Sequence, residues 1–241
     1  MAVVPYKEKD GSKKEQVAEM FDNISKRYDL LNHVLSLGID IGWRRKAIKI
    51  IREDKPKKIL DIATGTADFA IEAARMLEAD KIIGVDISEG MLSVGRQKVA
   101  KRGLQELVQL RTGDSENLQF EDNYFDSLLV AFGVRNFENL EAGLSEMLRV
   151  VRPGGKVVIV EFSKPNAFPF KQIYNAYFQA ILPVIGKVIS KDDSAYRYLP
   201  ESVQAFPDGD DFLRVLKKLG YQQTKCIPLT FGIASIYVGS K

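Results

Sequence analysis

Residues that build disulfides and metal centres are almost absent from this chain of 241 residues. A single cysteine, Cys226, excludes an internal disulfide and a cysteine-based zinc cluster. A single histidine, His33, further argues against metal catalysis. We therefore expect no metal ion, and a reducing, cytoplasmic location for the protein.

Long apolar runs and a large net charge are also missing. No apolar run reaches the ~20 residues that span a bilayer, and residues 1–16 lack the apolar core of a signal peptide. The formal net charge is only +3, with basic and acidic residues mixed throughout, whereas nucleic-acid-binding surfaces concentrate basic residues. We expect no nucleic-acid partner, and a protein that is soluble or peripheral to a membrane.

The chain does contain enough apolar material for one large core. Hydrophobic residues make up 45% of it, and α/β folds of this size are commonly a single domain. We expect one domain over residues 1–241. Its additions are a helical cap at residues 13–52, with a turn near Gly38, and an insertion at residues 164–207 that we interpret as a lid.

Short apolar runs alternate with helical patterns between residues 57 and 163. The runs lie at residues 57–63, 81–88, 107–113, 127–134 and 156–163. Helices are expected near residues 67–77, 91–102 and 140–151. Strands that are apolar almost throughout are typical of a parallel sheet buried on both faces. The pattern predicts a Rossmann-like α/β fold, a mostly parallel sheet with helices on both faces.

Turn residues indicate how the last elements begin and end. Pro153 ends the helix that starts near residue 140, and the two glycines after it turn the chain into the fifth strand. Beyond the insertion, a short helix at residues 210–219 precedes β-like segments at residues 221–230 and 232–240. We expect these two segments to form an antiparallel edge of the sheet.

The most informative stretch, residues 59–86, reads as strand, tight turn, helix, strand and acid. Gly65 in the turn lets the backbone pass close to a ligand. A dinucleotide site requires the spacing GxGxxG, but this chain has Ala63 before Gly65 and alanines after it. Asp68 would also repel a pyrophosphate. The stretch therefore disfavours NAD and favours a nucleoside with a cationic centre, which S-adenosylmethionine provides.

Acidic residues follow the first three predicted strands. Asp86 stands 25 residues after Asp61, where an acid in βαβ nucleotide folds accepts hydrogen bonds from ribose hydroxyls. Asp114 is placed to accept from an adenine amine, with the Ser115 amide meeting a ring nitrogen. For any one acid, simple helix capping remains the alternative. Donor contacts are predicted for Asp61, Gly65, Thr66, Asp68, Asp86, Ile87, Asp114 and Ser115.

Several separate motifs resemble the menaquinone and ubiquinone C-methyltransferase family of class I methyltransferases. They are DIATGTAD at residues 61–68, FGVRN at 132–136, RVVRPGG at 149–155, EFSKP at 161–165 and YRYLPESVQAFP at 196–207. The resemblance extends over nearly the whole chain. It implies a seven-stranded sheet with a final antiparallel strand, S-adenosylmethionine as donor, and methylation of demethylmenaquinol to menaquinol in the last step of menaquinone biosynthesis.

Transfer of a methyl group to an aromatic carbon requires an electron-rich ring, which a quinol supplies. Arg135 and Asn136 follow the fourth strand, where a guanidinium can stabilise phenolate charge and an amide can orient a hydroxyl. We assign these two residues and Tyr28 to catalysis, with a structural salt bridge as the alternative for Arg135. Substrate contacts are predicted for Phe132, Tyr196, Arg197 and Tyr198. For the aromatic residues Tyr28, Tyr196 and Tyr198, core packing is the alternative.

The insertion contains an apolar run at residues 173–189, which offers a path for an isoprenoid tail. Lys171, Lys187 and Lys191 flank this run, so we predict loose contact with the inner face of an anionic membrane. An ordinary helix packed on the sheet is the alternative. A homodimer is left open, because nothing in the sequence decides the oligomeric state.

Three rival functions remain. Methylation of a polyprenyl methoxybenzoquinol in ubiquinone biosynthesis uses the same chemistry. An NAD-dependent oxidoreductase is disfavoured by the missing glycines and by Asp68. A catalytically silent scaffold of quinone synthesis would be expected to lack Asp86 or the pair Arg135 and Asn136, and this chain has all three.

Overall fold

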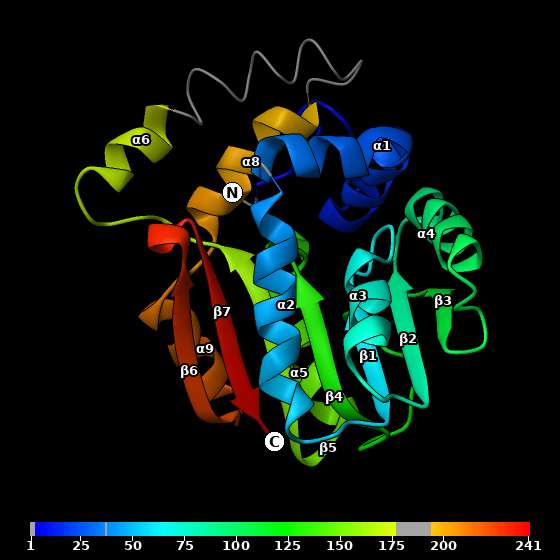
Figure 1. Ribbon diagram of the computed structural model, residues 1–241. Helices are drawn as coiled ribbons and strands as arrows, with labels where there is room; N and C mark the ends of the chain where they lie inside the picture. The colour runs from blue at the N-terminus through cyan, green and yellow to red at the C-terminus, as the bar shows by residue number, and fades with distance from the viewer. Residues whose placement is uncertain (1–2, 37, 177–193) are drawn as a thin grey trace.

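A seven-stranded sheet forms the centre of the computed structural model (Figure 1). The structure describes residues 3–36, 38–176 and 194–241, except for the side chains of residues 30–35, 173, 175 and 196. The strand order is β3-β2-β1-β4-β5-β7-β6. The strands are β1 (Lys58–Ile62), β2 (Lys81–Asp86), β3 (Val108–Thr112), β4 (Phe125–Ala131), β5 (Val151–Phe162), β6 (Gln222–Leu229) and β7 (Ala234–Ser240).

Strands β1 to β5 are parallel, as their apolar sequences predict. Strand β2 has five buried residues out of six, and β1 has four out of five. Because both faces of these strands are covered, nearly every position is apolar. The chain order reverses between β1 and β4, which places a topological switch point beside the carboxyl end of β1.

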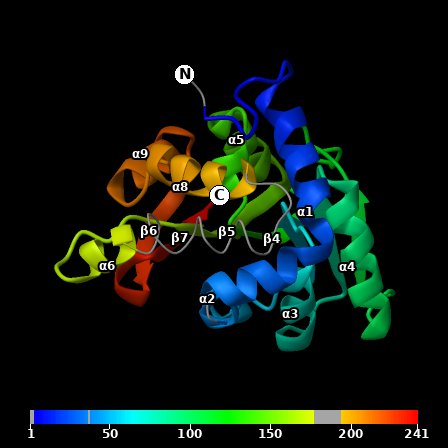
Figure 2. The ribbon, with the colours of Figure 1, turned by 90° about the horizontal axis from the view of Figure 1, so that it is seen from above.

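Helices cover both faces of the sheet. The α-helices of the described residues are α1 (Lys13–Ser36), α2 (Ile39–Arg52), α3 (Asp68–Met76), α4 (Glu89–Lys101), α5 (Leu140–Val150), α6 (Phe170–Ala176), α8 (Ser194–Ala205) and α9 (Asp210–Lys218). Figure 2 shows α2 and α3 on one side of the sheet and α5 and α9 on the other. Two separate apolar clusters fill these two layers. The predicted Rossmann-like α/β architecture is confirmed.

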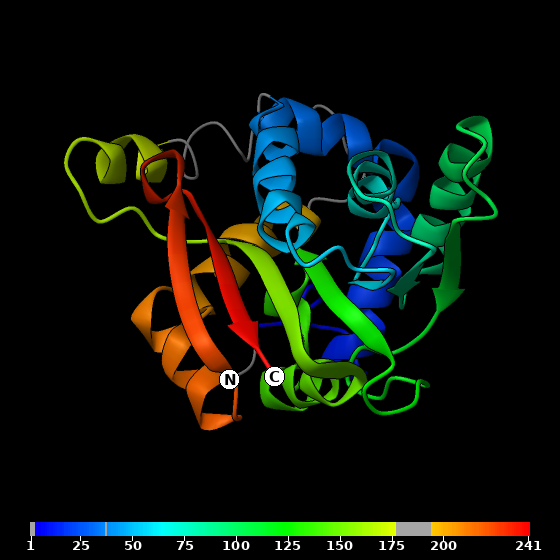
Figure 3. The ribbon, with the colours of Figure 1, turned by 60° about the horizontal axis from the view of Figure 1, so that its bottom comes forward.

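The last two strands form the antiparallel edge that the sequence predicts. Strand β7 lies between β5 and β6 and runs antiparallel to both (Figure 3). One boundary differs from the prediction, because β5 begins at Val151 rather than after the two glycines. Val151 already pairs with Phe125, and a bulge shifts the register before Ser127 pairs with Lys156. The turn residues therefore lie within an irregular strand instead of preceding it.

Of the predicted helical cap, α1 lies over the carboxyl ends of the parallel strands, where Figure 1 shows it together with α8, whereas α2 packs on a face of the sheet. Tyr198 of α8 is buried against Val17 and Met20 of α1. Within the predicted lid, α6 and α8 are helices, and α8 contains Pro200. Most of the apolar run at residues 173–189 lies outside the described residues. No helix in the described part is long and apolar enough to cross a membrane.

Candidate active site

A cavity opens at the carboxyl ends of β1, β2 and β4, beside the switch point. Helix α1 covers it with Val17, Phe21 and Tyr28. The walls include Lys14, Ala63, Gly65, Val85, Asp86, Ile87, Met91, Gly113, Asp114, Ser115, Glu116, Ala131, Phe132, Gly133, Asn136, Phe137 and Glu138. Residues from the first four parallel strands thus meet where the sequence predicts a donor site.

The loops after β1 and β4 touch beneath this cavity. A Cβ atom on Gly133 would lie 2.6 Å from the Cβ atom of Ala63, so only glycine allows this approach. Ala63 and Phe132 both have positive φ angles, 50° and 59°. Such conformations are costly for non-glycine residues and cluster at functional sites. The backbone is therefore strained on both sides of the switch point.

Asp86 joins the end of β2 to the turn after β1. Its Oδ2 atom accepts a hydrogen bond from the Gly65 amide at 2.8 Å, and its Oδ1 atom accepts from the Ser88 amide at 2.9 Å. Burial raises the pKa of Asp86 to about 6. The carboxylate lines the cavity while it stabilises the turn. It remains able to accept further hydrogen bonds, since each oxygen has a second lone pair.

Asp61 is buried behind the turn and is not among the cavity-lining residues. Its Oδ2 atom accepts from the Thr64 hydroxyl at 2.6 Å and from the Ala70 amide at 3.1 Å. Because Ala67 offers no side-chain oxygen at the start of α3, Asp61 supplies this cap from β1. Its Oδ1 atom has no partner in the described structure. Burial raises the pKa of Asp61 to about 7.

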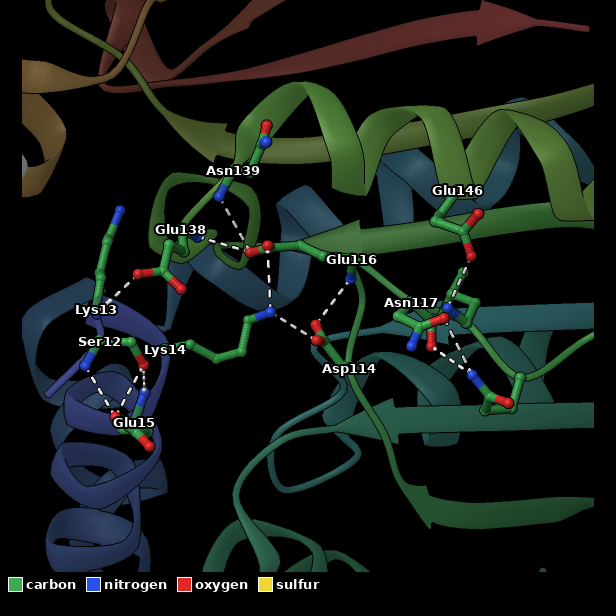
Figure 4. Close-up of polar contacts among 12 residues, drawn as sticks. Ser12, Lys13, Lys14, Glu15, Asp114, Glu116, Asn117, Glu138, Asn139 and Glu146 are labelled. Atoms are coloured by element: carbon green, nitrogen blue, oxygen red, sulfur yellow. Dashed lines mark hydrogen bonds and ion pairs between the residues drawn. The ribbon is translucent and has the colours of Figure 1, made fainter.

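Asp114 and Ser115 both line the cavity, but a residue of α1 already binds Asp114. The Lys14 ammonium group lies 2.6 Å from Asp114 Oδ2 and 3.2 Å from Glu116 Oε2 (Figure 4). The neighbouring Lys13 donates to the carbonyl oxygen of Phe137 at 2.7 Å. The start of α1 is thus attached to both sides of the cavity, at the loops after β3 and β4.

The charge of the cavity wall indicates which ligands it accepts. Asp86, Asp114, Glu116 and Glu138 line it, and Lys14 is the one cation among the described lining residues. The lining residues therefore carry a net charge of −3 when the four acids are ionised. Such a wall attracts a cationic ligand and repels a pyrophosphate.

Two predicted donor residues lie beside the cavity rather than in its wall. The Thr66 hydroxyl donates to Asp29 Oδ1 at 2.5 Å. Asp68 forms an ion pair with Lys98, which also lies 2.7 Å from Asp29 Oδ2. Lys98 therefore compensates Asp68. The acids of the cavity wall, rather than Asp68, therefore disfavour a pyrophosphate.

Tyr28, Phe132 and Asn136 line the cavity, as expected for residues near the reacting groups. A Cβ atom on Gly65 would lie 4.0 Å from Tyr28 Cε1, so Tyr28 covers the glycine turn. The Asn136 amide nitrogen donates to the Phe132 carbonyl at 3.3 Å. The Asn136 Oδ1 atom is buried and has no partner among the described groups. It is available to accept a hydrogen bond from a ligand hydroxyl.

Arg135 does not line this cavity, although it neighbours Asn136 in the short helix η1 (Val134–Asn136). Its Nη1 atom donates to Glu161 Oε1 at 2.8 Å and also to the Phe132 carbonyl. The guanidinium lies 5.3 Å from the centre of the Phe162 ring. Arg135 therefore faces the end of β5, where the salt bridge named as its structural alternative is present.

The predicted acceptor residues of α8 separate in the structure. Arg197 is exposed and lines a second cavity against residues 4–9. Tyr198 is buried, and burial raises the pKa of its phenol to about 12. The Tyr198 hydroxyl has no hydrogen-bond partner in the part of the chain that is described. The side chain of Tyr196 lies outside the described residues.

Several residues of this region could not be found from the sequence. Lys14 and Glu116 look like ordinary solvated charges, and Glu161 like the polar end of an apolar strand. Glu161 is singled out in the sequence only as the first residue of EFSKP, one of the motifs of the resemblance. Phe21 and Met91 belong to helical stripes that usually indicate core positions.

Comparison with known proteins gives close relatives over the full length. Demethylmenaquinone methyltransferase of Bacteroides fragilis is 50% identical over 239 residues, covering 99% of this chain and 97% of the relative. The ubiquinone/menaquinone biosynthesis C-methyltransferase UbiE of Geobacter sulfurreducens is 46% identical over 230 residues, covering 95% and 90%. These matches span the cap, the sheet and the antiparallel edge alike.

Solved structures share the fold at much lower identity. A SAM-dependent methyltransferase of Thermotoga maritima has a TM-score of 0.64 and 18% identity, covering 93% of this chain and 99% of that one. The model of the ubiE/COQ5 methyltransferase family matches residues 9–241. The predicted resemblance is thus confirmed, and the chain belongs to the ubiE/COQ5 methyltransferase family.

Proposed function

We propose that this protein transfers a methyl group from S-adenosylmethionine to a ring carbon of demethylmenaquinol, which forms menaquinol. The name of the Bacteroides fragilis relative, demethylmenaquinone methyltransferase, supports this acceptor. The structural observation that carries the proposal is the acid-lined cavity at the switch point. Its position and charge suit a nucleoside that carries a sulfonium.

The methyl donor of this chain is S-adenosylmethionine, and the cavity residues divide between its parts. Asp86 accepts from the ribose hydroxyls, and Ser115 lies beside the adenine end with Asp114. The Gly65 turn brings backbone close to the ligand. When bound, the donor supplies a methyl group whose bond to sulfur breaks with the electron pair left on sulfur. The acidic wall attracts the positively charged form more strongly than the neutral product.

The acceptor must be the reduced quinol, because a quinone ring is too electron-poor to attack. The quinol ring provides the electron pair of the new carbon–carbon bond, and the same ring carbon then loses its proton. Asn136 Oδ1, buried and unpaired within the described structure, is suited to bind an acceptor hydroxyl. Tyr28 closes the cavity from α1 and excludes water, so positioning supplies most of the rate.

Arg135 serves the acceptor from the other side of η1. Its Nε atom is buried without a partner in the described structure. A guanidinium there stabilises negative charge on a quinol oxygen during attack. The Tyr198 hydroxyl is the second unpaired donor on this side, and it belongs to α8, which contacts η1.

An exposed aromatic patch supports contact with a membrane, from which a prenylated quinol must be taken. Phe168 is 82% exposed and Phe231 is 67% exposed. Phe170 stacks on Phe231 with 3.9 Å between ring centres, so α6 and the β6–β7 turn form one surface (Figure 1). Exposed Lys171 adds a positive charge. Aromatic side chains with nearby lysines are typical of interfacial contacts.

Flotation with anionic liposomes tests this contact. The protein is expected to rise with the vesicles, and the double variant Phe168→Ser, Phe231→Ser is expected to remain at the bottom. Absence of co-migration by the unmodified protein would contradict the membrane proposal. Sedimentation of the pure protein tests the homodimer, which stays a prediction.

A second acceptor has specific support. The Geobacter sulfurreducens relative carries a name that joins ubiquinone with menaquinone biosynthesis. Methoxybenzoquinols also have an electron-rich quinol ring, but their ring system is smaller. We retain their methylation as the second candidate function.

One labelling experiment tests both functions. The protein is incubated with methyl-labelled donor and, in separate reactions, with reduced prenyl naphthoquinol and reduced prenyl methoxybenzoquinol. Label is expected in the naphthoquinol product, and the oxidised quinones serve as controls that should stay unlabelled. Label in neither product would contradict the catalytic proposal and favour a scaffold.

A further inference from the structure

Glu161 is a fully buried acid at the end of β5 with no part in the donor cavity. Its Oε1 atom accepts from Arg135 Nη1 at 2.8 Å and from the Phe162 amide at 2.9 Å. Its Oε2 atom accepts from the backbone amide of Arg135 at 3.3 Å. Glu161 thus binds Arg135 through both its side chain and its backbone.

Stability alone is a weak reason for such a pair. Burying two charges costs about as much as their attraction returns, and apolar residues often replace buried pairs without loss. Here Arg135 belongs to η1, and its neighbour Asn136 in η1 lines the donor cavity. The position suggests that the pair serves the site.

The contacts fix which edge of the Arg135 guanidinium remains available, the edge formed by Nε and Nη2. Nη1 is occupied twice, by Glu161 and by the Phe132 carbonyl. The Phe162 ring lies 5.3 Å from the guanidinium carbon. Nε is buried and donates to no group in the described structure. A planar guanidinium held at one end can present its remaining edge in only one direction.

Tyr198 provides a second unpaired group in the same region. Its hydroxyl is buried without a partner among the described residues. Helix α8, which carries Tyr198, contacts η1, which carries Arg135. The charges of Arg135 and Glu161 both act on this phenol, which agrees with that contact. Two buried polar groups without partners indicate that a ligand or a water completes their hydrogen bonds.

We propose that Glu161 is a positioning residue, which orients Arg135 so that Nε and the Tyr198 hydroxyl bind one oxygen of the acceptor ring. Glu161 itself does not touch the acceptor. Glu161 compensates the guanidinium charge in the free protein, and this keeps the side chain of Arg135 buried before the acceptor binds. The proposal rests on the proposed function, since it needs a hydroxylated acceptor ring.

The test is the variant Glu161→Gln, which keeps the shape and removes the charge. We expect kcat to fall by about 10- to 100-fold, because misplacing a catalytic group by about 1 Å costs this much. The dissociation constant of S-adenosylmethionine, measured by calorimetry, should stay within about twofold of the wild-type value, since only the transition state has lost an interaction. Glu141→Gln is the control, because Glu141 forms an exposed ion pair with Lys218 and does not contact Arg135 or Glu161 through any hydrogen bond of the described residues.

Two results would overturn the proposal. One is a kcat within about threefold of the wild-type value, which would leave no positioning role. The other is an equal fall in kcat and donor affinity, which indicates a structural role. If Glu161→Gln does not fold, Glu161→Asp replaces it, because the charge is kept while the carboxylate is withdrawn by one methylene. The same criteria apply to that variant. Failure of the proposed function would appear differently, as no methyl transfer by the wild-type protein.

Discussion

The ammonium group of Lys14 lies 2.6 Å from Asp114 Oδ2, so the first turn of α1 is joined to the loop after β3. Lys14 also reaches Glu116 at 3.2 Å (Figure 4). Both acids line the donor cavity, and Asp114 is the residue predicted to bind the adenine amine. A cation from α1 therefore stands at the predicted adenine end of the site and reduces the negative charge of the cavity wall.

Removing this cation should change the preference between donor and product. For Lys14→Met, we expect the ratio of S-adenosylmethionine to S-adenosylhomocysteine affinity to rise at least about twofold. A unit charge about 10 Å away is worth ~0.4 kcal/mol in water, and only the donor carries charge on sulfur. Calorimetry with both ligands measures the ratio. If the substitution loosens α1 over the cavity, the affinities for both ligands fall and the ratio does not change for that reason. Lys218→Met is the exposed control. An unchanged ratio would contradict an electrostatic role for Lys14.

Asp86 is expected to hold the donor by charge-assisted hydrogen bonds. Asp86→Ala should weaken donor binding by about 1 to 3 kcal/mol, because the ribose hydroxyls lose their acceptor. The turn also loses the partner of the Gly65 amide. Isothermal titration measures the affinity, and Asp80→Ala at the exposed opposite end of β2 is the control. Unchanged affinity would place the donor elsewhere.

The pH dependence follows from the raised pKa of Asp86, about 6 in the folded protein. Donor binding needs the ionised carboxylate, so affinity should rise between about pH 5 and pH 7 and then level off. Stability of the free protein should move in the opposite direction. A raised carboxyl pKa contributes stability at low pH that is lost as pH rises through the folded value.

Both trends are measured by calorimetric titration and thermal unfolding across this range, with Asp86→Asn as the comparison. In Asp86→Asn, donor affinity should rise less between about pH 5 and pH 7 than in the wild-type protein. Asp61 titrates nearby, at about pH 7, so a remaining slope near neutral pH belongs to it. A donor affinity that falls from pH 5 to pH 7 would contradict the assignment of Asp86.

The contact between the β1 and β4 loops should tolerate no side chain at Gly133. Gly133→Ala would place a Cβ atom 2.6 Å from the Cβ atom of Ala63. We expect a loss of about 1 to 3 kcal/mol in the free energy of unfolding, with weaker donor binding. Gly42→Ala in α2 is the matched control, because nothing lies within 4 Å of its Cβ position. That variant should gain about 0.5 to 1 kcal/mol in urea unfolding. Equal changes in the free energy of unfolding for Gly133→Ala and Gly42→Ala would exclude the steric explanation.

The parallel sheet was predictable because burial on both faces leaves a direct record in the sequence. Each of β1 to β5 coincides with an apolar run, and the antiparallel edge follows from two β-rich segments after α9. The bulged start of β5 was not predictable. Its register depends on pairing between Val151 and Phe125, which are neighbours only after β4 and β5 meet.

Part of the predicted donor site also follows from the parallel sheet. Parallel strands carry their carboxyl ends to one edge, so Asp86 and Asp114 meet at the cavity without any further information. Asp68 shows the limit of this argument. It follows the same strand end, but Lys98 of α4 compensates it, and no local spacing indicates a partner 30 residues away.

The sequence by itself determined the fold, the donor-binding edge and the family, because periodicity and motifs are local. The tertiary structure decided how charges are paired. Lys14 meets Asp114 across 100 residues, and Arg135 meets Glu161 across 26. Hydrogen bonds and ion pairs act over a few ångströms. Their partners are therefore set by how helices and loops pack around the sheet, and they govern what the strand-end acids and η1 can do.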